Sequence, residues 1–488
     1  MAMPETARRP ALSKFLDKWL YAMTGAYVLL MLLSLRYRFL DPFIATTWHG
    51  KIGLDFFAVP RGFINLLHGK SIYDTWAFAW GPYASWYPYH PAAAVLAGSW
   101  LSLFSPWAAY GVFVAVSLAI LIYCARLAGR GLEDSLSRKA LYFLFLCSPC
   151  AYLMLWNGQL HVLTVLSVSL IAAELFDAAK NPGVAGLRVR LLAGVLCSLL
   201  SRPLILPALP LLFAVKKFRA TMLWSLGIYA VVSLLFLAVP ALNPAGAGFD
   251  ALVDAVVHPG HIFQRALDGN IIRLTYKTAF LHDNAIHWLN MRNLSAVVRA
   301  DVFEFMSPSS FFADICGGVN PVLFKLPLLL LGVFSLGLFF IKDQFARNRA
   351  AVYVFAFSVL AFYMAYDSVY EYHFTTLLAV AAFLFAAYQR GAQGFRNGTV
   401  RVICAACALF YVPTSYYWVR NPDFGYHGAR TAAWPLKSIL TVLDAQPYAW
   451  ALWMIRLLRV VPVLALFAAM SYIIIVELRK GISDGREN

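Results

Sequence analysis

The chain has 488 residues, of which 61% are hydrophobic, 16% aromatic and only 13% charged. Because soluble domains contain about 25% charged residues, this composition excludes a soluble protein and predicts an all-α protein that crosses a membrane many times. The net charge of +16 does not indicate nucleic-acid binding, because Lys and Arg cluster in short loops between apolar runs, as in cytoplasmic loops that face anionic lipid.

The first apolar run predicts a membrane span from Leu20 to Phe39. Basic residues precede it, so the positive-inside rule places the N-terminus in the cytoplasm and the next loop, residues 40–106, outside. In that loop the segment from Asp55 to Leu67 has apolar residues at helical spacing with polar Arg61, Asn65 and His68 between them, which predicts a helix lying at a membrane surface. Asp55 begins this helix, where its carboxylate can serve either as a general base or as a helix cap.

The N-terminal part, residues 1–239, alternates apolar runs with basic loops. The run Pro91–Phe104 is shorter than the roughly 17 residues that a span needs, so we assign it to the outer interface. A pair of short runs flanks Ser201-Arg202-Pro203, which predicts either a tilted pair or a break near the outer leaflet with Arg202 at the break. The expected spans after the first are 107–126, 140–156, 160–176, the pair 191–200 and 204–215, and 221–239.

Residues 240–320 are expected to form a long extracytoplasmic segment. The C-terminal part, residues 321–488, repeats the alternation of apolar runs and basic loops. Its expected spans are 321–341, 351–366, 374–389, 400–417 and 460–476, with an interfacial helix at 434–443. The prediction is a bundle of about 12 spans with both ends in the cytoplasm.

This topology brings scarce polar residues from separate loops to the outer face, where ionisable groups near lipid are candidates for function. His161 can instead be a hydrogen-bonded core imidazole, and Glu371 a solvated helix cap. Arg202 lies between Leu200 and Pro203 and needs an anion or carbonyl groups to offset its desolvation, so we expect a phosphate or carboxylate partner. Besides Asp55, Arg202 and His373, the candidate binding residues are Arg61, His68, Tyr89, His90, Asn157, Gln159, His161 and Glu371.

Short motifs follow one another in a set order along roughly residues 1–220. They are G-L-D-F at 53–56, H-G-K-S-I-Y-D ending at Asp74, W-Y-P-Y-H-P ending at Pro91, N-G-Q at 157–159 and L-A-G-V-L-C-S-L-L-S-R-P ending at Pro203. Their order resembles the GT-C superfamily, and more narrowly glycosyltransferase family 87, the bacterial polyprenyl-phosphate-mannose-dependent mannosyltransferases. A weaker similarity covers Tyr370–His373. The chain departs from the family pattern in having His90 where a second proline is expected, and Arg202 where many relatives carry Lys.

The resemblance implies a lipid-linked sugar donor, with mannose as the expected sugar, and a catalytic carboxylate in the first outer loop, which is Asp55. In such a reaction the carboxylate takes the proton of an acceptor hydroxyl, while Arg202 and His373 hold the departing lipid phosphate. One base and one phosphate clamp suffice for an inverting displacement. Asp74 is the remaining candidate for a second acid.

The expected partners are a polyprenyl-phosphate-linked sugar, a lipid or glycan acceptor and membrane lipid, with no nucleic acid and no cofactor. Asp367, Glu371 and His373 offer ligands for a divalent ion, but no metal is expected. The expected location is the plasma (inner) membrane, with the active site on the extracytoplasmic face. A transporter or flippase of a lipid-linked sugar is the alternative function, although matched pairs of broken helices, typical of transporters, are absent from the sequence pattern.

Overall fold

The computed structural model describes residues 11–41, 44, 52–70, 72, 79–83, 89–130, 132–180, 187–201, 204–238, 326–365, 371–389, 397–412 and 449–484. In these ranges every regular element is a helix and none is a strand, which confirms the all-α class. The predicted outer segment 240–320 and the predicted interfacial helix 434–443 lie outside the described residues, as do Asp74, Arg202 and Asp367.

Five helices in the described ranges are long and apolar enough to cross a membrane. They indicate a membrane-embedded protein, and each overlaps a span that the sequence predicts. The five are α1 (Ala11–Tyr37), α5 (Pro106–Ala128), α8 (His161–Lys180), α18 (Gln344–Ala365) and α23 (Ala449–Asp484).

Pro149 breaks the predicted span 140–156 into two helices. α6 (Ser135–Leu146) ends before this proline and α7 (Pro149–Asn157) begins with it, at an angle of 42°. Proline lacks an N–H and is tolerated only in the first turn of a helix, and the Ser148 hydroxyl caps α7 by accepting a backbone N–H at 3.0 Å. The two helices together are a sixth candidate span in the described ranges, as predicted, but this span is bent at Pro149.

Two C-terminal helices have different bounds from those predicted. α20 (Asn397–Leu409) ends early, and α23 begins well before its predicted start. The buried Arg459 of α23 donates to the carbonyl oxygens of Leu409 and Val412, each at 2.8 Å. A helix leaves its last carbonyl groups without intrahelical partners, so this guanidinium stabilises the early end of α20.

Among the remaining predicted spans, α19 has the predicted bounds, α11 covers nearly the predicted residues, and α17 is shorter than predicted. The pair flanking Ser201-Arg202-Pro203 is α9 followed by a 3-10 turn and α10, so the chain leaves the α-helix near the predicted break. The other helices of this group each overlap one predicted span. The bounds are α9 (Val189–Ser201), α10 (Leu209–Ala214), α11 (Arg219–Ala238), α17 (Leu326–Phe340) and α19 (Phe374–Gln389).

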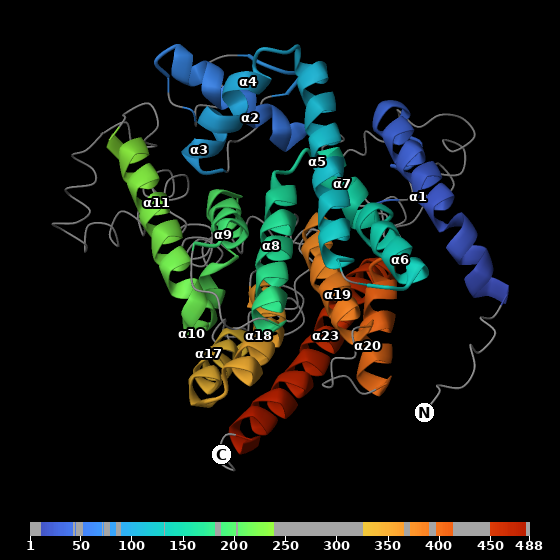
Figure 1. Ribbon diagram of the computed structural model, residues 1–488. Helices are drawn as coiled ribbons and strands as arrows, with labels where there is room; N and C mark the ends of the chain where they lie inside the picture. The colour runs from blue at the N-terminus through green and yellow to red at the C-terminus, as the bar shows by residue number, and fades with distance from the viewer. Residues whose placement is uncertain are drawn as a thin grey trace.

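α18 lies at the centre of the bundle. Its residues 350–365 are all buried, as is typical of a helix that is apolar on every side and surrounded by others. α8, α17 and α23 pack against it, and α19 packs against α8 (Figure 1). The buried apolar residues of the N-terminal and C-terminal parts therefore form one continuous cluster.

The described part of residues 40–106, the predicted first outer loop, forms a small helical layer at the end of the bundle where α5 begins (top of Figure 1). It contains α2 (Leu54–Leu67), α3 (Pro91–Ala93), a π-helical turn (Ala94–Gly98) and α4 (Ser99–Leu101). The π-helical turn approaches α2 so closely that a Cβ on Gly98 would lie 2.6 Å from the Val59 carbonyl oxygen. The prediction of helices in this loop is therefore confirmed. The run that begins at Pro91 forms a helix from Pro91 to Leu101, which is too short to count as a membrane span.

The polar residues of α2 do not form an exposed face. Arg61 is 3% exposed and Asn65 is fully buried, and Arg61 Nη1 donates to the Tyr83 carbonyl oxygen at 3.0 Å. The prediction that these residues alternate with apolar ones to make an amphipathic surface helix is wrong in this respect. α2 lies between the π-helical turn on one side and α5 and α7 on another, so both faces are covered.

Candidate functional site

The first turn of α2 is held against the end of α7 by two glycines. Gly53 N donates to the Trp156 carbonyl oxygen at 2.7 Å, and both Gly53 and Gly158 have positive φ, of 73° and 71°. A Cβ on Gly158 would lie 2.5 Å from Phe56 Cβ. Only glycine adopts this conformation without strain and permits this approach, so the motifs G-L-D-F and N-G-Q meet in space.

Asp55 lies at this contact and is the end of a line of hydrogen bonds. Gln159 Nε2 donates to Asp55 Oδ2. Tyr89 Oη donates to Gln159 Oε1 at 3.1 Å, and the backbone N–H of Leu160 donates to Tyr89 Oη at 3.4 Å. Because Tyr89 occupies the carbonyl oxygen of the Gln159 amide, the amide must turn its NH2 group toward Asp55.

Of these three side chains, Asp55 is the most exposed. Tyr89 and Gln159 are 5% and 6% exposed, whereas Asp55 is only partly buried. Asp55 lies in the first turn of α2, and the N-cap residue of the helix is Gly53, so Asp55 does not occupy the N-cap position. The positive end of the helix dipole favours its ionised form. The arrangement is an oriented carboxylate with buried hydrogen-bond support, which suits proton transfer at the carboxylate.

The imidazole rings of His161 and His373 pack against each other close to Gln159. His161 begins α8, two residues after Gln159, and its ring centroid lies 4.9 Å from that of His373. Thr376 Oγ1 lies 2.7 Å from His161 Nε2, and the His373 ring packs between Tyr363 and Tyr372, with centroids 6.0 and 4.3 Å away. The structure therefore brings both histidines together, in a buried environment that also fits the core-imidazole interpretation of His161.

Ser201, the residue before Arg202, lies near His161. Ser201, the last residue of α9, has its hydroxyl 3.1 Å from Thr164 Oγ1, and Thr164 lies one turn after His161 on α8. Arg202 itself lies outside the described residues. Glu371 begins the 3-10 turn that ends at His373 and packs against α7, and the Glu371 side chain is likewise outside the described residues.

Asn157 and His90 are close in sequence to Gln159 and Tyr89, respectively. Asn157 is the last residue of α7 and is buried. His90 caps α3, its Nδ1 accepting the Ala92 N–H at 3.2 Å, and its ring lies 5.3 Å from that of Tyr229 on α11. Burial lowers the pKa of His90 to about 4, so at neutral pH it is uncharged and offers no cation for a phosphate.

Arg61 and His68 are farther along α2. Burial also lowers the pKa of Arg61, whose guanidinium is used on the Tyr83 carbonyl. His68 is exposed at the C-terminal end of the helix, with Nδ1 2.8 Å from the Ile64 carbonyl oxygen. At 1.5 Å per residue the helix separates His68 from Asp55 by about 20 Å. The structure therefore does not bring His68 and Asp55 together, and a substrate-binding role for His68 stays a prediction.

No protein-family model, curated protein or solved structure matches this chain. No group of three or more His, Cys, Asp or Glu side chains that could hold a metal ion occurs among the described residues.

Sequence reasoning missed Asp41. This carboxylate is 2% exposed and accepts hydrogen bonds from Arg38 Nε at 2.9 Å, Tyr152 Oη at 2.7 Å and Trp156 Nε1 at 3.1 Å. Burial outweighs these donors and raises the pKa of Asp41. Asp41 ties the end of α1 to α7 at Trp156, whose carbonyl oxygen also receives Gly53 N, and so supports the Asp55 contact. Its sequence signal is an acid three residues after Arg38 in a charge-poor chain.

Proposed function

We propose that this chain is an integral membrane glycosyltransferase that moves a hexose, with mannose the expected sugar, from a polyprenyl-phosphate donor to a lipid or glycan hydroxyl, with inversion. The observation that carries the proposal is the line Tyr89–Gln159–Asp55, in which residues of three separate motifs orient one carboxylate. A transporter needs binding groups but has no need of a base held in this way.

In the proposed reaction, Asp55 accepts the proton of the acceptor hydroxyl as that oxygen attacks the anomeric carbon of the donor sugar. The bond between the anomeric carbon and the lipid phosphate breaks, and the phosphate leaves with the electron pair. Gln159, whose amide orientation Tyr89 fixes, holds the carboxylate plane during this transfer. A cation stabilises the departing phosphate, and we assign this role to Arg202, with His373 as the second donor.

The proposal includes a GT-C-type arrangement of about 12 spans, with the Asp55 layer on the extracytoplasmic face of the plasma (inner) membrane. The distribution of basic loops in the sequence supports it, because Lys342 to Arg349 and Arg390 to Arg401 separate apolar runs as cytoplasmic loops do. The layer of α2, α3 and α4 lies at the opposite end of α5 from Arg126 and Arg130 (Figure 1).

Labelling of single cysteines in intact cells tests this orientation. In a chain whose native cysteines are replaced by alanine, a membrane-impermeant maleimide should label Ser309→Cys and leave Lys342→Cys unlabelled until the membrane is permeabilised. The expected difference follows from the positive-inside rule. The opposite pattern would place Asp55 in the cytoplasm and overturn the proposed access to an outward-facing donor.

The donor clamp is tested at Arg202. Arg202→Ala should weaken donor binding by about 2 kcal/mol or more, because a charge-assisted hydrogen bond in a water-poor site is lost. Arg202→Lys should retain part of the affinity, since the charge survives without the bidentate fork. Titration of purified protein with a polyprenyl-phosphate sugar measures both. Unchanged donor affinity in Arg202→Ala would give Arg202 a structural role.

Transfer of radiolabelled mannose from polyprenyl-phosphate-mannose by the purified, reconstituted protein tests the function itself. Formation of a labelled glycolipid or glycan supports the proposal. Movement of the intact labelled donor between leaflets, with no transfer to any acceptor, would instead identify a flippase.

A further inference from the structure

A basic cavity lies between α1, α5, α6 and α9, away from the Asp55 layer. Its volume is about 530 Å³. Tyr110, which packs on Phe56 beside Asp55, and Arg126, which lines the cavity, are both on α5. Sixteen residues of helix separate them by about 24 Å, so this cavity and the candidate active site are different places.

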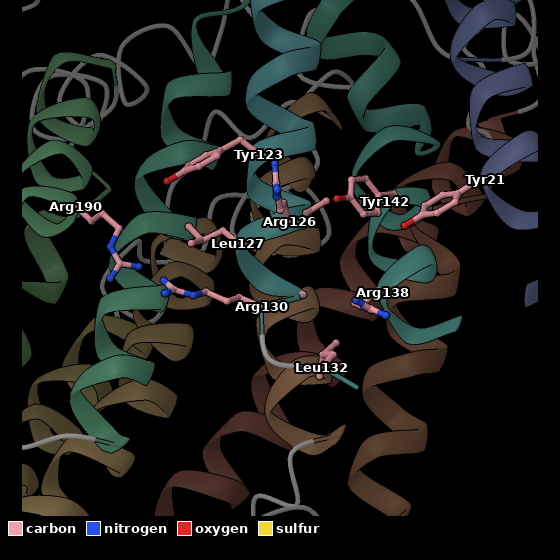
Figure 2. Close-up of a pocket in the computed structure, with 11 residues that line it drawn as sticks. Tyr21, Tyr123, Arg126, Leu127, Arg130, Leu132, Arg138, Tyr142 and Arg190 are labelled. Atoms are coloured by element: carbon pink, nitrogen blue, oxygen red, sulfur yellow. The ribbon is translucent and has the colours of Figure 1, made fainter. Parts of the chain in front are cut away.

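The lining is made of guanidinium and phenol groups with small and apolar residues. Figure 2 shows Arg126, Arg130, Arg138 and Arg190 around the cavity, with tyrosines between them. None of the described residues that line it is acidic. The full lining is Tyr21, Tyr123, Ala125, Arg126, Leu127, Gly129, Arg130, Leu132, Arg138, Tyr142 and Arg190. In the part of the chain that the structure describes, Arg126 and Arg138 have no ion-pair partner.

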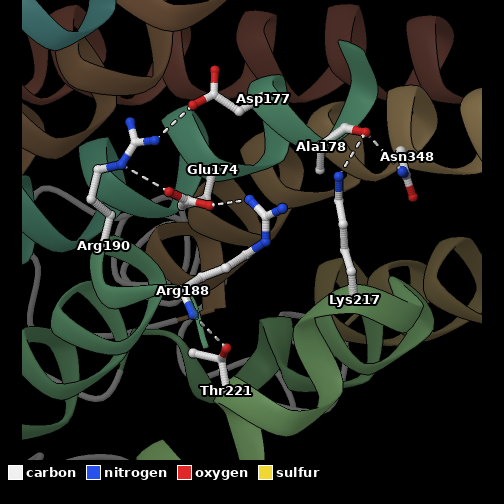
Figure 3. A network of polar contacts seen from close by, with 8 residues as sticks. All are labelled: Glu174, Asp177, Ala178, Arg188, Arg190, Lys217, Thr221 and Asn348. Atoms are coloured by element: carbon white, nitrogen blue, oxygen red, sulfur yellow. Dashed lines mark hydrogen bonds and ion pairs between the residues drawn. The ribbon is translucent and has the colours of Figure 1, made fainter. Parts of the chain in front are cut away.

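Two acidic side chains hold the Arg190 guanidinium in place. Its Nε lies 2.8 Å from Glu174 Oε1, and its Nη2 lies 2.8 Å from Asp177 Oδ2 (Figure 3). A second cavity of about 190 Å³ shares Leu127, Arg130 and Arg190 with the first and adds Lys180 and Asp177. The acids of this region therefore fix one arginine at the rim, and the other three arginines of the larger cavity come from α5, the turn after it and α6.

Repulsion among so many cations is costly unless an anion occupies the space between them. The positive-inside rule accounts for basic loops, but it does not require arginines from separate helices to converge on one hollow. Guanidinium groups match phosphate oxygens in a bidentate manner, and tyrosine hydroxyls supply further donors at a membrane interface. The chemistry of the cavity thus fits a phosphate group.

The surroundings favour a lipid as the source of the phosphate. Large apolar side chains are exposed beside the cavity, including Trp19 on α1 and Ile122 and Tyr123 on α5. Both helices are candidate membrane spans, so their exposed apolar faces are available to acyl chains. We propose that this cavity binds the phosphate headgroup of an anionic phospholipid from the cytoplasmic leaflet, with the acyl chains along α1 and α5.

The test compares lipid retention by purified protein from mixed vesicles of phosphatidylglycerol and phosphatidylcholine, using native mass spectrometry. The double variant Arg126→Gln, Arg138→Gln should retain phosphatidylglycerol about thirtyfold less well, because each basic residue near an anionic headgroup contributes about a factor of five. The matched control, Lys342→Gln with Arg401→Gln, removes the same charge from exposed positions outside the cavity. It should retain the lipid normally.

Equal loss in both double variants would show diffuse attraction to the membrane and overturn the site. Displacement of the lipid from the wild-type protein by inorganic phosphate or glycerol phosphate at similar concentration would also overturn it, since the acyl chains would then contribute nothing. Because all altered arginines are exposed, folding is checked by size-exclusion profile, and the single variant Arg130→Gln repeats the test with less change. The result does not depend on whether the chain transfers a sugar.

Discussion

Asp55→Asn should leave the protein folded and membrane-inserted, with donor binding retained and sugar transfer lost by at least about 100-fold. A sugar hydroxyl is a poor nucleophile until its proton is removed, and positioned proton transfer contributes about 10²- to 10⁴-fold. Asparagine keeps the size of the side chain, and its carbonyl oxygen can still accept from Gln159 Nε2. It has no basic oxygen to take the proton. Initial rates of transfer, with donor titration alongside, measure the two effects separately.

Asp134→Asn is the matched control for the loss of one negative charge. Asp134 caps α6, its Oδ2 accepting the Ser137 N–H at 2.7 Å, and Asn serves nearly as well as Asp at this position. Transfer by this variant should be unchanged. Near-normal turnover by Asp55→Asn would sink its assignment as the base and make Asp74 the next candidate, whereas loss of donor binding together with transfer would give Asp55 a binding role.

The sequence could predict that Asp55, Gln159 and His161 lie near one another, because the basic-loop pattern predicts that their loops share one side of the membrane. The contact itself depends on Gly53 and Gly158, whose left-handed backbone allows the approach. Positive φ at both positions is a property of the folded turns, so the motifs indicated that the loops share a face but not that they touch.

The prediction of a polar face on α2 and the predicted end of α20 failed for a related physical reason. Arg61 and Asn65 have the spacing of a polar helix face, but tertiary packing covers that face and a carbonyl of the same loop receives the Arg61 guanidinium. Arg459, which lies in an apolar run, donates to carbonyl oxygens some 50 residues earlier in the chain. Helical periodicity reports which residues share a face, and it does not report which element covers that face.

In contrast, the break at Pro149 could have been predicted from the sequence. The dipeptide Ser148-Pro149 has the same sequence signal as Ser105-Pro106, where a helix also begins with proline. The run before Ser105-Pro106 is too short for a span, whereas the total length of 140–156 suits one. Length therefore predicts a span at 140–156 but does not predict its bend at Pro149.

Glu174 joins the helices at the end of the bundle opposite Asp55. It is 3% exposed, and its two oxygens accept from Arg188 Nη1 at 2.7 Å and Arg190 Nε at 2.8 Å (Figure 3). Beside it the Ala178 carbonyl oxygen near the end of α8 accepts from Lys217 Nζ at 3.2 Å and from Asn348 Nδ2 at 2.9 Å. One acid and one carbonyl thus connect α8 to α9, to the turn before α11 and to α18.

Glu174→Gln should lower the free energy of unfolding by about 3 kcal/mol, because removing one partner of a buried ion pair leaves the other charge uncompensated. Here two guanidinium groups lose the carboxylate between them, and their partial exposure, 18% and 33%, keeps the cost toward the lower end for such pairs. Unfolding of the detergent-solubilised protein, followed by circular dichroism, measures the difference. Glu133→Gln, at an exposed position in the turn before α6, should change stability by less than about 0.5 kcal/mol. Equal stability of the two variants would mean that solvent reaches the Arg188 and Arg190 pairs and screens them as it does surface ion pairs.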